Sequence, residues 1–190
     1  LSQRWFKQLA REFTQAMVNT THFGAYLEPL IQSFRPYWTT THSRARVAAW
    51  RDETREIITL VLQPLGVWSG FEAGQFIELS IDLNGRRFTR CFSISSSPSH
   101  YIKTGQIELT IRIQPDGRVT PNLRHHLQLG QMVGISIAKG DFRLKDKQDS
   151  LLFIAGGSGI TPFRSMLNEM AHQVKPPLTT LLYYCRRSEE

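Results

Sequence analysis

A short apolar run, three glycines and a Thr-Pro pair together have the composition of an anion-binding turn. Residues 151–155 are apolar and uncharged, which predicts a strand buried on both faces in a parallel sheet. The glycines that follow are Gly156, Gly157 and Gly159. Glycine has no side chain and tolerates positive φ, so a ligand can approach bare backbone there. Thr161 and Pro162 suit a helix start, where threonine can cap free N–H groups and the dipole attracts phosphate.

The helix predicted after this turn leads to a second strand, which completes a strand–helix–strand unit. Phe163, Met166, Leu167 and Met170 fall on one helical face, and residues 178–184 form another apolar run. Ligands of such sheets lie beyond the carboxyl ends of the strands. The glycine spacing matches neither the Walker loop nor the Rossmann pattern, so a tight connection that binds nothing is the alternative.

Composition and charge limit the possible classes of function. The 190 residues suffice for one large or two small domains, and 41% hydrophobic with 21% charged residues is ordinary for a globular protein. The net charge of +7 favours an anionic partner, but scattered basic residues argue against nucleic-acid binding. Cys91 and Cys185 are too few for an iron–sulfur or zinc site, and the six histidines lack zinc-ligand spacing, so no metal is expected. Reduced cytoplasmic thiols are the default.

An N-terminal extension over residues 1–42 is expected to be helical, chiefly over residues 1–34. Four apolar residues recur there at helical spacing: Phe6, Leu9, Phe13 and Met17. Charged residues between them exclude a signal peptide or a membrane span in this segment. The apolar stripe either packs on the domain that follows or docks a partner or a bilayer surface.

From residue 43 the hydrophobic pattern changes from helical to alternating, which predicts strands. Six runs have this pattern: residues 45–49, 56–62, 75–81, 87–94, 107–113 and 132–137. Asn84-Gly85 predicts a tight hairpin between the third and fourth strands. A short helix is expected over residues 121–127 and a plain loop over residues 95–98. Short strands with this turn punctuation predict an antiparallel barrel.

Two further motifs lie among the predicted barrel strands. They read Arg90-Cys91-Phe92-Ser93 and Gly117-Arg118-Val119-Thr120, and the glycine turn follows them. With these motifs in this order, residues 43–190 resemble the ferredoxin–NADP reductase superfamily, and most of all the reductases that serve fatty-acid desaturases and oxygenases. The resemblance implies a six-stranded antiparallel flavin-binding barrel followed by a parallel α/β nucleotide-binding domain.

The resemblance also implies a role for each motif residue. Arg90 would pair with the flavin phosphate, Phe92 would pack on the isoalloxazine ring, and Ser93 would lie near its N5 atom as the catalytic position. Phe92 replaces the usual tyrosine, which keeps the stacking but removes a hydroxyl contact. The other implied cofactor-binding residues are Arg112, Gly117, Val119 and Thr120 for the flavin pyrophosphate, and Gly156, Gly157, Gly159, Thr161 and Pro162 for the nicotinamide nucleotide.

The implied protein is a flavin-dependent oxidoreductase that passes electrons from NADPH through FAD to a ferredoxin-type iron–sulfur carrier, in the service of a desaturase or an oxygenase. Its FAD-binding barrel would cover residues 43–148 and its NAD(P)-binding α/β domain residues 149–190. Related nucleotide domains continue with three more strands, so residues 149–190 are expected to be a truncated domain, and a [2Fe-2S] cluster would need a further C-terminal domain.

The implied function leads to expectations about the catalytic residues and the location of the protein, and it has an alternative. The cofactor supplies the chemistry, so no side-chain general base is expected. The protein would be cytoplasmic, and peripheral at the membrane if its partner is a membrane-bound desaturase. The alternative function is a flavin-binding or partner-docking module that does not turn over, or an inactive fragment.

Coenzyme preference is predicted from the end of the second nucleotide-domain strand. An acidic residue near that position typically binds the ribose of NAD, whereas an arginine accommodates the 2′-phosphate of NADP. Here the strand runs into Arg186, Arg187 and Ser188, which predicts NADPH. The alternative is that both arginines are simply solvated in a basic protein.

Overall fold

The computed structural model describes residues 43–83, 85–144 and 149–185 of the chain. The chain divides after Thr41, and every described residue lies in the second unit, His42–Glu190. The helical extension predicted over residues 1–42 therefore lies outside the described residues. So do Arg186, Arg187 and Ser188, on which the coenzyme prediction rests.

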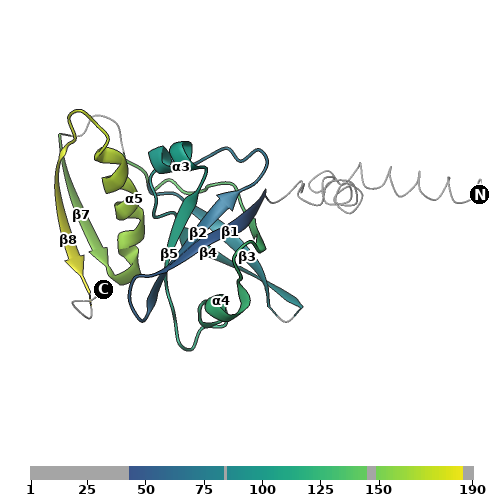
Figure 1. Cartoon of the computed structure of the whole chain (residues 1–190). Coiled ribbons are helices and arrows are strands. Elements are labelled where there is room, and N and C mark those ends of the chain that lie inside the picture. The colour runs from purple at the N-terminus through teal and green to yellow at the C-terminus, as the bar shows by residue number, and fades with distance from the viewer. Residues whose placement is uncertain (1–42, 84, 145–148, 186–190) are drawn as a thin grey trace, which may run out of the picture. The chain divides into compact units, whose positions relative to one another are not determined.

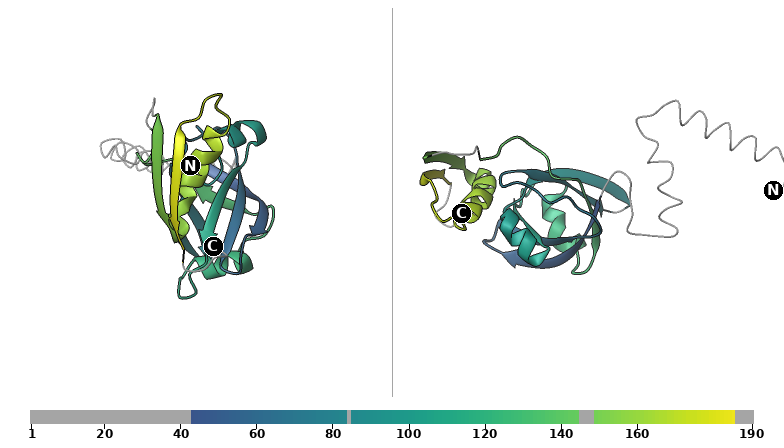
Figure 2. Two further views of the ribbon diagram at one scale, coloured as in Figure 1. Left: turned by 90° about the vertical axis from the view of Figure 1, so that its left-hand side faces the viewer. Right: turned by 90° about the horizontal axis from the view of Figure 1, so that it is seen from above.

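Six strands form one antiparallel sheet, as the alternating pattern predicts. They are β1 Ser43–Asp52, β2 Ile57–Pro64, β3 Phe76–Leu83, β4 Arg86–Ser93, β5 Ile107–Arg112 and β6 Met132–Ile135. The sheet order is β4-β3-β6-β1-β2-β5, so that β4 and β5 are its two edges. Figure 2 shows the sheet curled into a barrel, which brings these edges toward each other.

The barrel core follows from the alternation of side chains along each strand. On β3, Ile77, Leu79 and Ile81 are buried and point inward, and they meet the inward residues of β2 and β5. The β3–β4 hairpin is confirmed, because Leu83 pairs with Arg86 across a two-residue connection. Gly85 in that connection has φ +74°, the left-handed conformation that the turn requires.

Two short helices belong to the barrel unit. The predicted helix near residue 121 is α4, Thr120–His126. The other, α3 Pro98–Thr104, is not among the predicted elements. It begins where the loop expected over residues 95–98 ends. Ser97 caps α3 by accepting a hydrogen bond from the His100 N–H at 3.1 Å.

The C-terminal part forms the predicted strand–helix–strand unit. Strand β7 Ser150–Gly156 pairs in parallel with β8 Leu178–Tyr184, and between them run the 3₁₀ turn η1 Gly157–Ile160 and the helix α5 Thr161–Met170. Figure 1 shows α5 lying between this strand pair and the barrel. Its predicted apolar face is confirmed, since Met166 and Met170 are buried together with Phe153 of β7.

The prediction that β7 is buried on both faces is wrong for the described residues. Phe153 and Ala155 are buried under α5, but Leu152 and Ile154 are 60% and 59% exposed. Alternate side chains of a strand point to opposite faces, and α5 covers only one face of the pair. An apolar run alone therefore does not show that both faces of a strand are covered. None of the described helices is both long and apolar enough to cross a membrane.

Candidate functional site

The residues expected to contact the flavin ring and phosphate lie on the edge strand β4. Arg90 pairs with Leu79 and Phe92 with Ile77, so both side chains leave the sheet on the same side as these inward residues. Phe92 is half-buried against the barrel core, and Ser93 is also half-buried. Arg90 is exposed, and its guanidinium donates to the Thr89 carbonyl at 2.8 Å. None of the ion pairs recorded for the described residues involves Arg90, so its charge is available for an anion.

The Gly117 motif forms a tight turn between β5 and α4. The Gly117 N–H donates to the Gln114 carbonyl at 2.8 Å, and a Cβ at Gly117 would stand 2.9 Å from that oxygen. Thr120 accepts a hydrogen bond from the Gln114 N–H at 2.9 Å, while Val119 is buried. These contacts give Gly117, Val119 and Thr120 structural roles that do not require a bound cofactor. Val119 caps α4 without a side-chain hydrogen bond, so the first N–H groups of this helix have no side-chain acceptor.

The glycine turn is built from β7, η1 and the start of α5. Of its three glycines only Gly157 has a positive φ, +50°. The expected capping by Thr161 is wrong, because its hydroxyl donates backward to the Ser158 carbonyl at 2.6 Å instead of accepting from a helix N–H. Ile160 occupies the cap position and makes no side-chain hydrogen bond, while Pro162 lies in the first turn. The Thr161 N–H donates to the Ser158 carbonyl and Pro162 has no N–H, so it is mainly the positive end of the helix dipole that suits an anion here.

Arg112 of β5 brings the barrel and the glycine turn together. It forms an ion pair with Glu56 at 3.0 Å. Its second guanidinium nitrogen lies 3.7 Å from the position that a Cβ on Gly157 would take. A larger residue at position 157 would therefore contact this guanidinium.

Two cavities adjoin this contact. One, of about 640 Å³, is lined by Glu56, Arg112, residues 156–158 of the turn, Tyr184 and Cys185. The other, of about 500 Å³, includes Arg112, Gly157, Thr161 and Arg164. Arg90, Phe92 and Ser93 line neither of them. Apart from the Gly117 motif before α4, the predicted site residues that the structure describes thus fall into two groups, one on the β4 edge and one, joined by Arg112, at the glycine turn.

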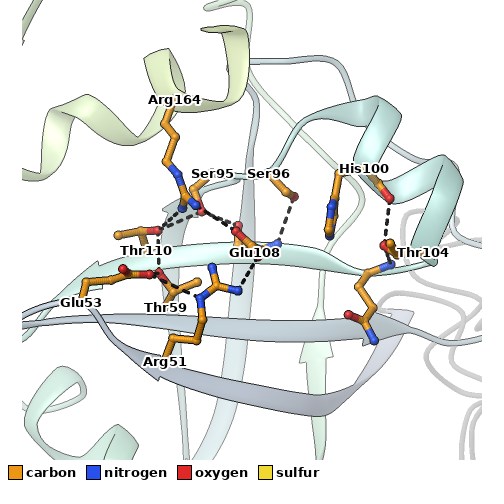
Figure 3. Close-up of polar contacts among 11 residues, drawn as sticks. Arg51, Glu53, Thr59, Ser95, Ser96, His100, Thr104, Glu108, Thr110 and Arg164 are labelled. Atoms are coloured by element: carbon orange, nitrogen blue, oxygen red, sulfur yellow. Dashed lines mark hydrogen bonds and ion pairs between the residues drawn. The ribbon is translucent and has the colours of Figure 1, made fainter. Parts of the chain in front are cut away.

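A polar network that the sequence analysis missed connects these groups (Figure 3). Its centre is Glu108 of β5, whose side chain is only 10% exposed. One carboxylate oxygen accepts from Arg51 of β1 at 2.8 Å, and the other faces Arg164 of α5 at 3.3 Å. Burial opposes ionisation, but the hydrogen bond from Arg51 and the charges of Arg51, Arg164 and His100 hold the pKa of Glu108 below its usual range. The hydrogen bond to Glu108 in turn raises the pKa of Arg51.

The loop after the β4 motif takes part in the same network. Ser95 and Ser96 are buried, and the Ser95 N–H donates to the Glu108 carbonyl at 2.8 Å. Ser96 accepts from the Glu108 N–H at 3.0 Å, and its carbonyl accepts from the Ser165 hydroxyl of α5 at 2.6 Å. The sequence of β5, Ile-Glu-Leu-Thr-Ile-Arg, is an ordinary alternating pattern, so nothing in it marks Glu108 as the centre of a network. Among the described residues, no three His, Cys, Asp or Glu side chains are grouped so that they could hold a metal ion.

Comparison with known protein families matches both halves of the described unit. The oxidoreductase FAD-binding domain matches residues 55–144, and the oxidoreductase NAD-binding domain matches residues 153–190. The chain therefore belongs to the ferredoxin–NADP reductase family and contains FAD-binding and NAD-binding oxidoreductase sequence in that order.

Curated relatives include several reductases. NADPH oxidoreductase of Mycobacterium tuberculosis is 31% identical over 140 residues, which cover 73% of this chain and 37% of that protein. The glycine betaine monooxygenase reductase of Chromohalobacter salexigens is 33% identical over 133 residues, 68% of this chain and 35% of that protein. The chain thus spans less than half the length of these relatives.

Solved structures share the fold. Phthalate dioxygenase reductase has a TM-score of 0.67 at 23% identity, over 78% of this chain and 45% of that one. A ferredoxin NADP+ reductase from Neisseria gonorrhoeae, solved with bound FAD and NADP, has a TM-score of 0.65 at 20% identity, over 79% of this chain and 60% of that one. The barrel and the parallel strand pair are therefore the fold of this family.

The residues present fit both cofactors of the family. Phe92 offers a half-buried aromatic side chain, and Arg90 offers a cation without a carboxylate partner among the described residues. The starts of α4 and α5 both lack a side-chain cap. Gly157, with its positive φ, keeps the backbone of the glycine turn bare.

Proposed function

We propose that the chain is the FAD-binding and nucleotide-binding part of a reductase that takes electrons from NADPH and delivers them to an iron–sulfur carrier. The observation that carries this proposal is the joining of the two residue groups. The β4 motif and the glycine turn belong to one unit and are linked through Ser95, Ser96, Glu108 and α5.

The roles of the chain's own residues follow from their surroundings. Arg90 binds the pyrophosphate as an exposed cation, and Phe92 supports one face of the ring system. Ser93 lies at the end of β4, directly before the buried serine loop, so it is the proposed hydrogen-bonding residue beside the reacting edge of the flavin. Bound FAD supplies the exchange between two-electron and one-electron transfer, and no side chain is required as a general base.

The glycine turn forms the proposed nicotinamide-nucleotide site. The positive end of the α5 dipole attracts phosphate, while Gly156, Gly157 and Gly159 leave the backbone of the turn open to it. Arg112 adds a positive charge at the border between this turn and the barrel, where the flavin pyrophosphate is also proposed to lie near Gly117, Val119 and Thr120.

The acceptor and the coenzyme are finer parts of the proposal. The solved phthalate dioxygenase reductase transfers electrons from pyridine nucleotides to a [2Fe-2S] centre, and the glycine betaine relative is the reductase of a monooxygenase. By analogy we assign this chain a ferredoxin-type acceptor in a desaturase or oxygenase system, in the cytoplasm or at the membrane surface. Selectivity for NADPH is assigned to Arg186, Arg187 and Ser188, so Arg186→Ala and Arg187→Ala should lower the NADPH to NADH ratio of kcat/KM.

One experiment separates a working reductase from a module that only binds flavin. The full-length protein is purified with its flavin, and the FAD to protein ratio is measured before NADPH-driven reduction of a one-electron dye is followed. A reductase gives stoichiometric FAD and many turnovers. Stoichiometric FAD without dye reduction would identify the non-catalytic module, and absence of FAD after reconstitution would reject both.

A further inference from the structure

Helix α5 is attached to the barrel unit by polar contacts along its whole length. Arg164 donates to the Thr110 hydroxyl at 3.0 Å and forms an ion pair with Glu108 at 3.3 Å. One residue further, Ser165 is fully buried and donates to the Ser96 carbonyl. Near the end of the helix, Glu169 accepts from the N–H and the hydroxyl of Ser99 at 2.9 and 2.8 Å. The helix is therefore held at two levels, at Arg164 and Ser165 and again at Glu169, rather than by apolar packing alone.

Among these contacts between α5 and the barrel, those of Arg164 lie nearest to the glycine turn. It lies one helical turn after Ile160, where η1 ends, so its contacts hold the part of α5 next to the glycine turn. Two nitrogens of its planar guanidinium reach two partners on β5, a hydroxyl and a carboxylate, in a fixed geometry that a lysine ammonium does not provide. Figure 3 shows Arg164 reaching from α5 toward Thr110 and Glu108.

The partners of Arg164 are fixed from the barrel side. Thr110 accepts from Arg164 and donates to Ser95, and its hydroxyl lies 3.0 Å from that of Thr59. Glu108 is held by Arg51 through its other oxygen. The Glu108 side chain is largely removed from solvent and Thr110 is half-buried, so the Glu108 contact is less screened than a surface ion pair.

The same partners also position the flavin-motif strand. Ser95 follows Ser93 by two residues, and the N–H and hydroxyl of Ser95 both bond to the Glu108 carbonyl, at 2.8 and 3.0 Å. Glu108 therefore touches the loop after the β4 motif with its backbone and α5 with its side chain. A single residue of β5 connects the position proposed beside the flavin with the helix that follows the glycine turn.

We propose that Arg164, acting through Glu108 and Thr110, is a positioning residue that sets how closely the glycine turn presents a nucleotide to the flavin. It does not contact either cofactor in this role. The kinetic consequence of this proposal rests on the proposed function. Its structural consequence, the anchoring of α5, does not. A misplacement of about 1 Å of reacting groups can cost about a hundredfold in rate, so even a small shift of α5 would be measurable.

The kinetic arm uses the full-length, FAD-loaded protein mixed rapidly and anaerobically with NADPH. Arg164→Met keeps the apolar stem and removes the charge, and Arg164→Lys keeps the charge without the fork. Both variants are expected to slow flavin reduction at saturating NADPH, about ten- to a hundredfold for Arg164→Met and less for Arg164→Lys. The apparent dissociation constant for NADPH and the FAD content are expected to stay unchanged. Glu108→Gln combined with Arg164→Met should be no slower than the slower single variant.

The control is Arg143→Met. The Arg143 side chain is 38% exposed, against 39% for Arg164, and it also pairs with two acceptors, Glu72 and Asp141, outside the network. NADPH should reduce the flavin of Arg143→Met at the wild-type rate. Weaker NADPH binding with an unchanged reduction rate would show that Arg164 contacts the nucleotide, and loss of FAD or of folding would show a purely structural role. Either result, or no effect, overturns the proposal.

The second arm needs neither nucleotide nor turnover. Hydrogen exchange is compared in wild type, Arg164→Met and Glu108→Gln. Faster exchange is expected for the amides of Gly157–Ile160 and the first turn of α5 in both variants, with unchanged protection of β2 and β3. If the wild type fails to reduce its flavin but this pattern appears, the proposed function fails while the anchoring role stands. Unchanged exchange at the turn overturns the anchoring role itself.

Discussion

Replacing Arg90 by alanine should weaken FAD binding without weakening the fold. The Arg90 side chain is exposed, and its recorded hydrogen bond is to the neighbouring Thr89 carbonyl. Its loss leaves no buried group unsatisfied, so the free energy of unfolding of the flavin-free protein should change by less than about 0.5 kcal/mol. A hydrogen bond to a charged group is worth about 1.5–3 kcal/mol, which corresponds to a loss of about ten- to 150-fold in FAD affinity.

The assay is a titration of flavin-free protein with FAD, followed by quenching of flavin fluorescence, together with a denaturant melt. The matched control is Arg87→Ala, because Arg87 lies on the same strand but on the opposite face and pairs with exposed Asp82 at 3.3 Å. Arg87→Ala should bind FAD like the wild type. If the two variants bind FAD equally well, or if Arg90→Ala unfolds, the assignment of Arg90 to the flavin phosphate is wrong.

Three further changes test other parts of the site and the fold. Phe92→Ala should weaken FAD binding about two- to tenfold whereas Phe92→Tyr should not, as the same titration would show; equal loss in both would argue against stacking. Gly74→Ala should lower the free energy of unfolding by about 1–3 kcal/mol in a denaturant melt, since φ is +101° and the new Cβ would stand 2.1 Å from the Phe142 carbonyl oxygen. Gly85→Ala, with φ +74° and open space, should cost less. Because the pKa of Glu108 is lowered on folding, its carboxylate stabilises the protein above the usual pKa of 4.5, and this contribution is lost as pH falls through the lower folded pKa. Glu108→Gln should thus destabilise by about 1.5–3 kcal/mol at neutral pH and by less in acid, and a pH-independent difference would refute the ionic role.

The barrel could be predicted from the sequence because its strands and its hairpin are marked by patterns of neighbouring residues. Alternation along each strand marks the inward residues, and Asn84-Gly85 marks the hairpin without reference to distant residues. The start of α5 was predicted from Thr161-Pro162 for the same reason. Helix α3 also had local signals that were overlooked, namely a capping serine before Pro98 and Gly105, with φ +69°, after its end.

The remaining features depend on contacts between residues far apart in sequence. Glu108 meets Arg51 and Arg164, which lie 57 residues before it and 56 residues after it in the printed sequence, and no local pattern predicts that they converge. The capping role expected of Thr161 failed because Ser158 in η1 offers its carbonyl to the same hydroxyl. Leu152 and Ile154 resemble buried residues by type alone, and only the arrangement of α5 shows which face of β7 is covered.

The central claim is that the barrel holds a flavin that a nucleotide bound at the glycine turn can reduce. Its most direct test is the visible absorbance of the flavin in the full-length, FAD-loaded protein after anaerobic mixing with NADPH. The account predicts that the oxidised flavin absorbance disappears with one equivalent of NADPH per FAD and returns when an electron acceptor is added. Flavin that stays oxidised under excess NADPH and excess NADH would contradict the account.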